Sequence, residues 1–348
     1  KELVTSIDTG SAFAVLCIIA FHFVIFNSKF KEKIFGRMKN VPPQMVSTVL
    51  GGIILIVVAS LLFGPSFVPS KVQAVLTNLI TPSASRLLLT VAENKQPYFN
   101  EWAGSFGPYW FNVPITFWLF FLGSIYLFYK VLDSLHKKDR VMLTISYVVF
   151  LVSLVFSRYN TSSILNGTNF ISKAVYAIGF IFFACCLIYY VYRYNKRGEQ
   201  ERLKSIDFAF ILFFSLFLLS VIAARAAIRT IMVLDPSAAI LISYVLLVSL
   251  RKAIHSPSGG RKIAVSILSG FIILLASLSF YQLYAGVEGA AQSYVPSIYT
   301  QQWQKAMSWV RSSTPTEAVF GHWWDYGYWL QSIGERATVL DGGNAISY

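Results

Sequence analysis

The stretch Phe208-Ala-Phe-Ile-Leu-Phe-Phe-Ser-Leu-Phe-Leu-Leu-Ser-Val-Ile-Ala-Ala224 contains no charged residue. A helix needs roughly 17 to 25 mostly apolar residues to cross the hydrocarbon core of a bilayer, so this stretch is a candidate transmembrane helix. Seven more apolar runs of similar length lie at residues 10–27, 46–64, 113–132, 141–157, 172–192, 231–250 and 263–284. The sequence therefore predicts a mostly α polytopic membrane protein with about eight transmembrane helices.

The composition agrees with this fold class. The chain is 55% hydrophobic, 16% aromatic and only 13% charged, as is typical of polytopic membrane proteins. The net charge of +13 does not indicate a nucleic-acid partner, because the basic residues are divided among separate loops. Cys17, Cys185 and Cys186 lie inside apolar runs, so they indicate neither a disulfide framework nor a metal-ligand spacing.

The basic residues are concentrated in every second connection between the apolar runs. Eighteen of the twenty-nine Lys and Arg residues lie in segments 28–45, 130–140, 193–206 and 251–262. The positive-inside rule places these four segments in the cytoplasm. An alternative in which each basic cluster is only a solvated face does not predict this alternation.

An even number of spans places both ends of the sequence outside the cytoplasm. Residues 1–284 are then a transmembrane domain with a long external loop at 65–112, and residues 285–348 are the start of an extracytoplasmic α/β domain. Loop 158–171 also lies outside and contains two Asn-x-Ser/Thr sequons, which begin at Asn160 and Asn166.

The external C-terminal segment contains the most distinctive string of the chain, Gly321-His-Trp-Trp-Asp-Tyr-Gly-Tyr-Trp329. Ala318 to Phe320 reads as a short buried strand, and Asp325 lies where that strand turns into a helix. Asp325 could simply cap this helix, with the tryptophans in a core. The alternative is recognition of a small hydroxyl group, because a carboxylate accepts a hydroxyl hydrogen bond and neighbouring indoles exclude water.

The string resembles the Trp-Trp-Asp-Tyr-Gly signature of the oligosaccharyltransferase catalytic subunit, a membrane enzyme that glycosylates asparagine in Asn-x-Ser/Thr sequons. The resemblance implies that Trp323, Trp324 and Asp325 bind the Ser or Thr two residues after the acceptor asparagine.

The same resemblance assigns a role to one carboxylate in the long external loop. Taken alone, Glu93 is more often an exposed loop charge than a catalytic group. In the family, the corresponding loop carries a Ser/Thr-x-x-Glu motif whose glutamate holds the acceptor amide, and Thr90 to Glu93 matches this motif. The catalytic residue implied is Glu93. One extra residue separates it from Gln96-Pro97, a pair that follows the motif in archaeal and eukaryotic members, and these two receive no role.

Two arginines near the membrane boundary, Arg225 and Arg229, are candidates for binding the donor. Both could simply extend to the outer surface, but charges inside or near a membrane are costly and are functional candidates by default. The segment resembles the family's arginine-containing helix, which implies that Arg229 binds the donor phosphate and that Arg225 assists. Between Glu93 and Arg229 the sequence has about two more spans than the family pattern.

The resemblance implies transfer of an oligosaccharide from a lipid-linked (pyro)phosphate donor to a sequon asparagine, by a multi-pass enzyme of archaeal type in the cell membrane. Its expected partners are the lipid-linked oligosaccharide, an acceptor polypeptide and membrane lipids. The expected cofactor is a divalent metal, Mn²⁺ or Mg²⁺, with its main ligands outside this sequence. We expect an internal fragment that is inactive alone. The alternatives are another glycosyltransferase that uses a polyprenyl-phosphate sugar, a lipid-linked glycan transporter, and a structural membrane subunit.

Overall fold

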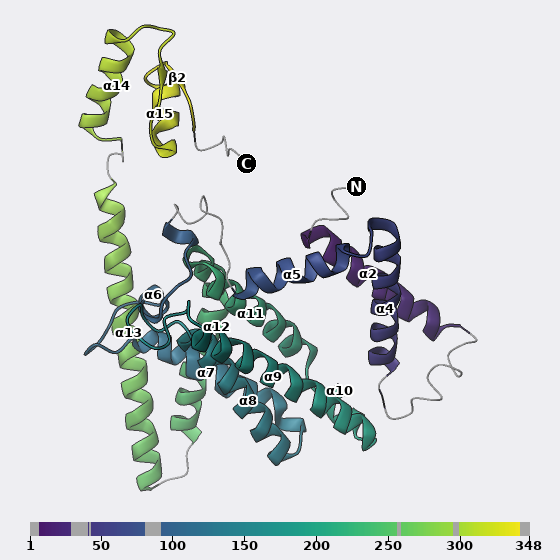
Figure 1. The fold of residues 1–348 in the computed structure, drawn as a ribbon. Coiled ribbons are helices and arrows are strands. Elements are labelled where there is room, and N and C mark those ends of the chain that lie inside the picture. Colours follow the sequence, from purple (N-terminus) through teal and green to yellow (C-terminus); the bar gives the residue numbers. More distant parts are fainter. Residues whose placement is uncertain are drawn as a thin grey trace. The chain divides into compact units, whose positions relative to one another are not determined.

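The computed structural model describes residues 7–28, 41, 43–80, 92–255, 259–294 and 299–341. It divides into two compact units, residues 1–281 and 282–348. The first unit is helical, with short 3₁₀ helices denoted η (Figure 1). Its elements are α2 (Ile7–Phe26), α4 (Pro43–Phe63), α5 (Phe67–Ile80), η2 (Ala92–Asn94), α6 (Phe99–Ser105), α7 (Ile115–Val131), η3 (Leu132–Ser134), α8 (Lys137–Phe156), α9 (Phe170–Lys196), α10 (Gln200–Lys204), α11 (Phe208–Ala226), η4 (Ile228–Thr230), α12 (Ile231–His255) and the first part of α13 (Gly260–Ser293), which continues into the second unit.

Each of the eight apolar runs is a helix, so the prediction of a mostly helical polytopic membrane protein is confirmed. Among the described residues, seven helices are long and apolar enough to cross a membrane, and a shorter apolar helix covers Ala12–Phe26. Many of their large apolar side chains are exposed, as expected for helices that face lipid.

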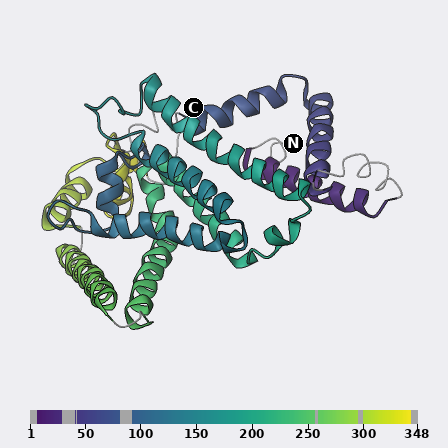
Figure 2. The ribbon, with the colours of Figure 1, turned by 90° about the horizontal axis from the view of Figure 1, so that it is seen from below.

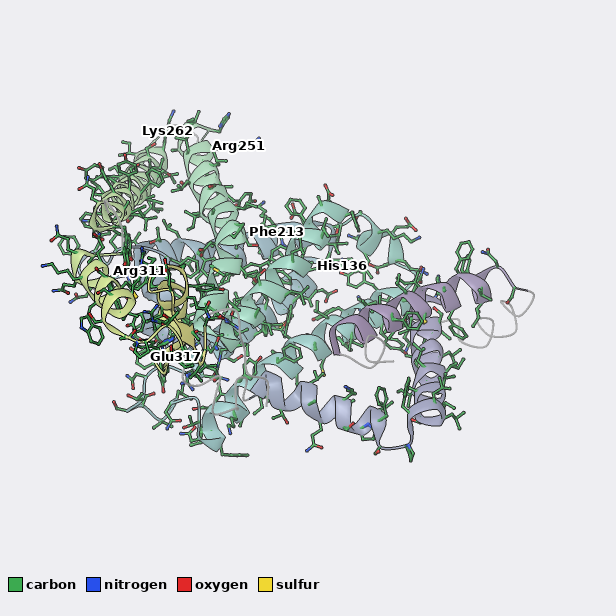
Figure 3. The ribbon with its side chains drawn as sticks, turned by 90° about the horizontal axis from the view of Figure 1, so that it is seen from above. His136, Phe213, Arg251, Lys262, Arg311 and Glu317 are labelled. Carbon is green, nitrogen blue, oxygen red and sulfur yellow. The ribbon has the colours of Figure 1, made fainter. Side chains whose placement is uncertain are left out.

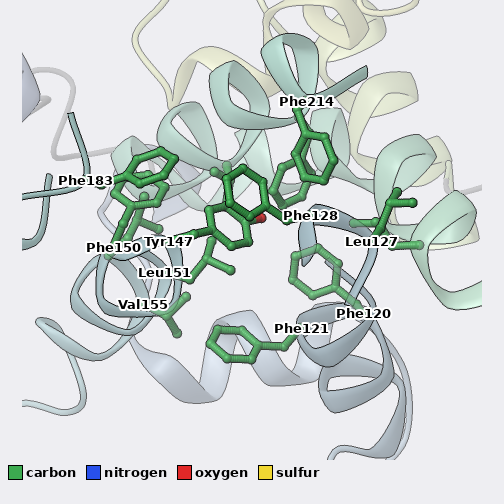
Figure 4. Packing of buried hydrophobic residues seen from close by; sticks show 14 of the residues in the cluster. Phe120, Phe121, Leu127, Phe128, Tyr147, Phe150, Leu151, Val155, Phe183 and Phe214 are labelled. Carbon is green, nitrogen blue, oxygen red and sulfur yellow. The ribbon is translucent and has the colours of Figure 1, made fainter. Parts of the chain in front are cut away.

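The core of the first unit is aromatic and lies between α7, α8, α9, α11 and α12. Phe128 stacks on Tyr147 with ring centroids 4.3 Å apart, and Phe150 stacks on Phe183 at 5.3 Å (Figure 4). Helices α8 and α9 run side by side, as Figure 1 and Figure 2 both show. Helix association in a membrane depends on such van der Waals contact, because lipid tails are as apolar as the side chains.

The two ends of this helix bundle are chemically different. At one end the basic segments 130–140 and 193–206 meet: Ser134 Oγ donates to the Arg202 carbonyl at 2.8 Å, and Arg202 Nη1 donates to the Ser134 carbonyl at 3.0 Å. Arg251 and Lys262 lie beside the connection from α12 to α13 (Figure 3). The opposite end holds the poorly basic connections at 92–98, 157–169 and 227–230. Two of the predicted basic segments, 130–140 and 193–206, therefore lie together at one end of the bundle. Segment 28–45 lies largely outside the described residues, and the sidedness of the loops stays a prediction.

The second unit contains α14 (Gln301–Ser313), β1 (Val319–Phe320), η5 (Trp324–Tyr326), α15 (Gly327–Ser332) and β2 (Ala337–Thr338). The two strands are parallel, with Val319 opposite Ala337 and Phe320 opposite Thr338. Its small core is formed by Met307, Val310 and Leu330.

Arg336 is buried and caps the C-terminal end of α14. Its Nη2 donates to the carbonyls of Arg311 and Thr314, both at 2.7 Å. These hydrogen bonds satisfy carbonyl groups that the last turn of a helix leaves without an intrahelical partner.

Candidate functional site

Glu93 lies in η2, at the poorly basic end of the bundle. Its side chain is exposed and forms no hydrogen bond or ion pair with the described residues, whereas the next residue, Asn94, is buried. Thr90, which begins the predicted motif, lies outside the described residues. Among the described residues the Glu93 carboxylate thus has no partner, while the backbone segment that carries it is held in place by other contacts.

The anchor is Gln96, one of the residues to which the sequence assigned no role. Its Oε1 accepts a hydrogen bond from Arg225 Nη1 at 2.9 Å and a longer one from Arg158 Nη1 at 3.4 Å. Gln96 is 8% exposed and Arg225 is 6% exposed, so the contact is shielded from water. Tyr176 lies against the Arg225 guanidinium, with the ring centroid 5.4 Å away.

The Glu93 loop (residues 92–98) also contacts the Arg229 turn (residues 227–230). The amide of Ile228 donates to the carbonyl of Lys95 at 3.0 Å, which joins the two segments through their backbones. Arg229 is exposed and, among the residues described, forms no ion pair or hydrogen bond. The fold therefore brings together the neighbourhoods of the predicted catalytic and donor-binding residues, although the four candidate membrane spans α7, α8, α9 and α11 separate them in the sequence.

Arg158 was not identified from the sequence. It follows the end of α8, and its guanidinium carbon lies 4.1 Å from the centroid of the Tyr98 ring. Burial lowers the pKa of Arg158, and the nearby Tyr98 and Glu101 partly oppose this effect. The rule that singled out Arg225, a cation at the end of an apolar run, could also have found Arg158.

The two sequons of loop 158–171 differ in their hydrogen bonding. Asn160 is exposed and its Oδ1 accepts from the Ser162 amide at 3.0 Å. Asn166 is half-buried, and its Oδ1 accepts from both the amide and the hydroxyl of Thr168, at 2.9 and 3.0 Å. Gly167 adopts φ +82°, and a Cβ there would lie 2.6 Å from Arg158 Cγ. This glycine lets the loop pack closely against Arg158.

The signature string lies in the second unit, and its polar part is on the surface. Trp323 is 53% exposed and Asp325, in η5, is also exposed. Asp325 forms no hydrogen bond with the described residues, and the N-cap of α15 is Tyr326, so the interpretation of Asp325 as a helix cap is wrong. For Trp324 the described structure covers the backbone alone.

The third tryptophan of the string belongs to the core. Trp329 packs edge to face on Trp303, with ring centroids 4.7 Å apart, and also contacts Tyr299. The core interpretation of the tryptophans is thus correct for Trp329 and wrong for Trp323. Trp323 and Asp325 are thus both exposed on the second unit, and their binding of a sequon hydroxyl stays a prediction.

A resident metal ion would need several ligating side chains close together. The described residues contain no group of three or more His, Cys, Asp or Glu side chains that could hold a metal ion. They therefore do not fit a metal centre by themselves, and the expectation of ligands elsewhere stays a prediction.

The fold and these residues define a class: a multi-pass membrane protein with an exposed carboxylate and an exposed arginine on adjoining segments at one end of its bundle. Comparisons with known proteins narrow this class. No protein-family model matches the chain, and no solved structure matches it significantly.

Curated relatives do match. The chain is 35% identical over 86 residues to dolichyl-phosphooligosaccharide-protein glycotransferase 1 of Pyrococcus furiosus, which covers 24% of this chain and 9% of that protein. It is 22% identical over 213 residues to dolichyl-phosphooligosaccharide-protein glycotransferase 3 of Archaeoglobus fulgidus, covering 51% and 23%. A plant relative is the dolichyl-diphosphooligosaccharide–protein glycosyltransferase subunit STT3B of Oryza sativa subsp. japonica, 24% identical over 90 residues, covering 23% and 12%.

These matches confirm the resemblance to oligosaccharyltransferase catalytic subunits. The aligned regions span between 9% and 23% of the lengths of these three relatives. What those whole proteins do is therefore a proposal for this chain.

Proposed function

We propose that the intact protein carrying this chain transfers an oligosaccharide from a lipid-linked (pyro)phosphate donor to asparagine in Asn-x-Ser/Thr sequons. The observation that carries the proposal is the hydrogen bond between the Lys95 carbonyl and the Ile228 amide. It joins the segment of an exposed carboxylate, Glu93, to the segment of an exposed cation, Arg229. The printed names of the relatives supply the reaction class, a glycosyl transfer to protein.

The acceptor amide nitrogen must be activated before it can attack the sugar. An amide nitrogen is a poor nucleophile because its lone pair is delocalised into the carbonyl, the resonance that gives peptide bonds a rotational barrier of about 18 to 20 kcal/mol. A carboxylate that accepts hydrogen bonds from the amide NH₂ orients it and weakens this conjugation. Glu93 is exposed and has no described partner, so it is available for this role.

Group transfer also needs positive charge beside the leaving group. The bond from the acceptor nitrogen to the anomeric carbon of the sugar forms, the bond from that carbon to the phosphate oxygen breaks, and the nitrogen loses one proton to the medium. The leaving (pyro)phosphate keeps the bonding electrons, and guanidinium suits its geometry. In our proposal Arg229 contacts this phosphate.

Asp325 and Trp323 complete the proposal by binding the sequon hydroxyl. The carboxylate accepts the hydrogen bond of the Ser or Thr hydroxyl, and the indoles of Trp323 and Trp324 exclude water from it. A divalent metal, Mn²⁺ or Mg²⁺, is also part of the proposal, but we derive no step through the metal because the described residues do not hold it.

Asp325→Ala tests this function in the full-length protein. We expect the affinity for a sequon peptide to fall by about ten-fold or more, because a hydrogen bond to a charged group is lost, while affinity for the lipid-linked donor stays the same. Peptide affinity is measured by titrating a fluorescent sequon peptide. Glu317→Ala is the matched control, since Glu317 is an exposed carboxylate of the same unit. Equal peptide affinity in the Asp325→Ala and control proteins would remove the proposed role.

A further inference from the structure

Gln96 has no part in the proposed chemistry, yet it is the buried side chain on which two arginines converge. Its Oε1 accepts from Arg225 Nη1 at 2.9 Å and from Arg158 Nη1 at 3.4 Å. We propose that Gln96 is a positioning residue with two effects. It docks the Glu93 loop against the Arg229 turn, and as a neutral acceptor it leaves the positive charge of Arg158 and Arg225 available to an anionic donor. The second effect rests on the proposed function.

The docking follows from where the attachments lie along the chain. Lys95 contributes the backbone link to Ile228, and Gln96, the next residue, contributes the side-chain link to Arg225. The exposed side chain of Glu93 has no described partner, so its position is set by the backbone that carries it. Loss of the Gln96 acceptor would leave the buried guanidinium of Arg225 and the half-buried guanidinium of Arg158 short of a partner and would favour release of the loop.

The electrostatic effect follows from the identity of the acceptor. Arg225 has no carboxylate partner among the described residues, and its Nε is buried without a hydrogen bond. Glu101, the carboxylate near Arg158, is already paired with Lys95 at 2.9 Å. A neutral amide oxygen satisfies a donor without cancelling its charge, so the arginine pair keeps a positive field at this end of the bundle. Such a field favours an anion.

Two substitutions at Gln96 separate the two effects. Gln96→Leu removes the acceptor and leaves the arginine charges unchanged. Gln96→Glu keeps an acceptor at the same place and adds a negative charge that pairs with both arginines. Gln96→Asn, which keeps the amide on a shorter side chain, is the milder test of docking. Gln73→Leu makes the same chemical change at an exposed position of α5 and is the control.

Docking is measured by disulfide formation between Lys95→Cys and Ile228→Cys, in full-length protein without other cysteines. We expect Gln96→Leu to slow crosslinking by about ten-fold, the loss expected when a hydrogen bond to a charged group is removed. Gln96→Asn should fall between it and the parent, and Gln96→Glu and Gln73→Leu should crosslink at the parent rate. Crosslinking of the Gln96→Leu protein at the parent rate would overturn the docking role.

The charge effect is measured by binding of dolichyl phosphate to the purified protein in detergent. We expect Gln96→Glu to weaken this binding by about ten-fold, as one added charge at close range would do, and Gln73→Leu to leave it unchanged. Unchanged binding in Gln96→Glu would overturn the charge effect. Neither measurement needs turnover. If the parent binds dolichyl phosphate but transfers no glycan to a sequon peptide, the proposed function is wrong. The crosslinking and binding measurements still show in that case whether Gln96 has the two proposed effects.

Discussion

At the scale of single residues, Gly327 shows why the signature string ends in glycine. It is buried at the start of α15, where a Cβ would lie 2.5 Å from the Leu340 carbonyl oxygen and 2.7 Å from Asp341 Cα. Both are backbone atoms that cannot rotate away. Gly327→Ala must therefore push α15, and Asp325 with it, away from this segment, at a cost of about 1 to 3 kcal/mol.

We expect faster hydrogen–deuterium exchange in residues 327–332 of the Gly327→Ala protein and weaker binding of a sequon peptide. Gly321→Ala is the matched control, because a Cβ at Gly321 meets nothing within 4 Å. The packing argument fails if the exchange rates of the two variants agree.

Some residues of the candidate site could be identified from the sequence, and others could not. Arg225 and Arg229 were candidates because charges near a membrane are costly, whereas Glu93 was assigned a role only through its resemblance to a family motif. Gln96 was passed over because an amide in a loop carries no such signal, and its role depends on Arg225, which lies far along the chain. The exposure of Trp323 and the burial of Trp329 were likewise decided by tertiary contacts, since both are tryptophans in the same short string.

At the scale of elements, α8 and α9 approach so closely that only glycine fits at position 179. A Cβ on Gly179 would lie 1.8 Å from Ser153 Oγ and 2.5 Å from Ser153 Cβ on the facing helix. We expect Gly179→Ala to lower the thermal unfolding midpoint through an overpacking cost of about 1 to 3 kcal/mol, and Ser153→Gly to restore it in the double variant. In the control Gly270→Ala, the new methyl group meets nothing within 4 Å. A Gly179→Ala midpoint equal to that of the control would contradict this account.

A hydrogen bond between His136 and Glu199 joins the connection before α8 to the connection after α9, and we expect its contribution to stability to depend on pH. His136 Nε2 lies 2.5 Å from Glu199 Oε2, and this hydrogen bond, helped by Arg202, holds the pKa of Glu199 below its ordinary value. A lowered folded-state pKa stabilises the protein above the unfolded pKa, and this stabilisation is lost as the pH falls through the folded pKa.

We therefore expect Glu199→Gln to unfold at a lower temperature than the parent at neutral pH, with the difference disappearing in acid. The measurement is the unfolding midpoint of both proteins in detergent across the acidic range. A difference between the two midpoints that does not change with pH would rule out this linkage.

At the scale of the whole molecule, the positions of the helices could be predicted from the sequence, but which helices pack against each other could not. A run such as 208–224 is helical in a membrane because its backbone must satisfy its own hydrogen bonds, which is a local requirement. The pairing of α7 with α12, or the arrival of the Arg229 turn beside the Glu93 loop, depends on side-chain packing between segments that are distant in sequence. Which loops lie in the cytoplasm is easier to predict than which helices pack together. That prediction compares the charges of all the loops but needs no knowledge of the contacts between them.

Sidedness can be tested with one residue at each end of the bundle. Asn160 is exposed at the end that carries the Glu93 loop, and Lys204 is exposed at the end where the basic segments meet. Asn160→Cys and Lys204→Cys, each in a background without other cysteines, are exposed to a membrane-impermeant maleimide. In intact cells we expect labelling at position 160 alone, and at position 204 only after permeabilisation, because positively charged loops stay in the cytoplasm. The reverse pattern would place Glu93 and Arg229 in the cytoplasm, on the wrong side for glycosylating exported proteins.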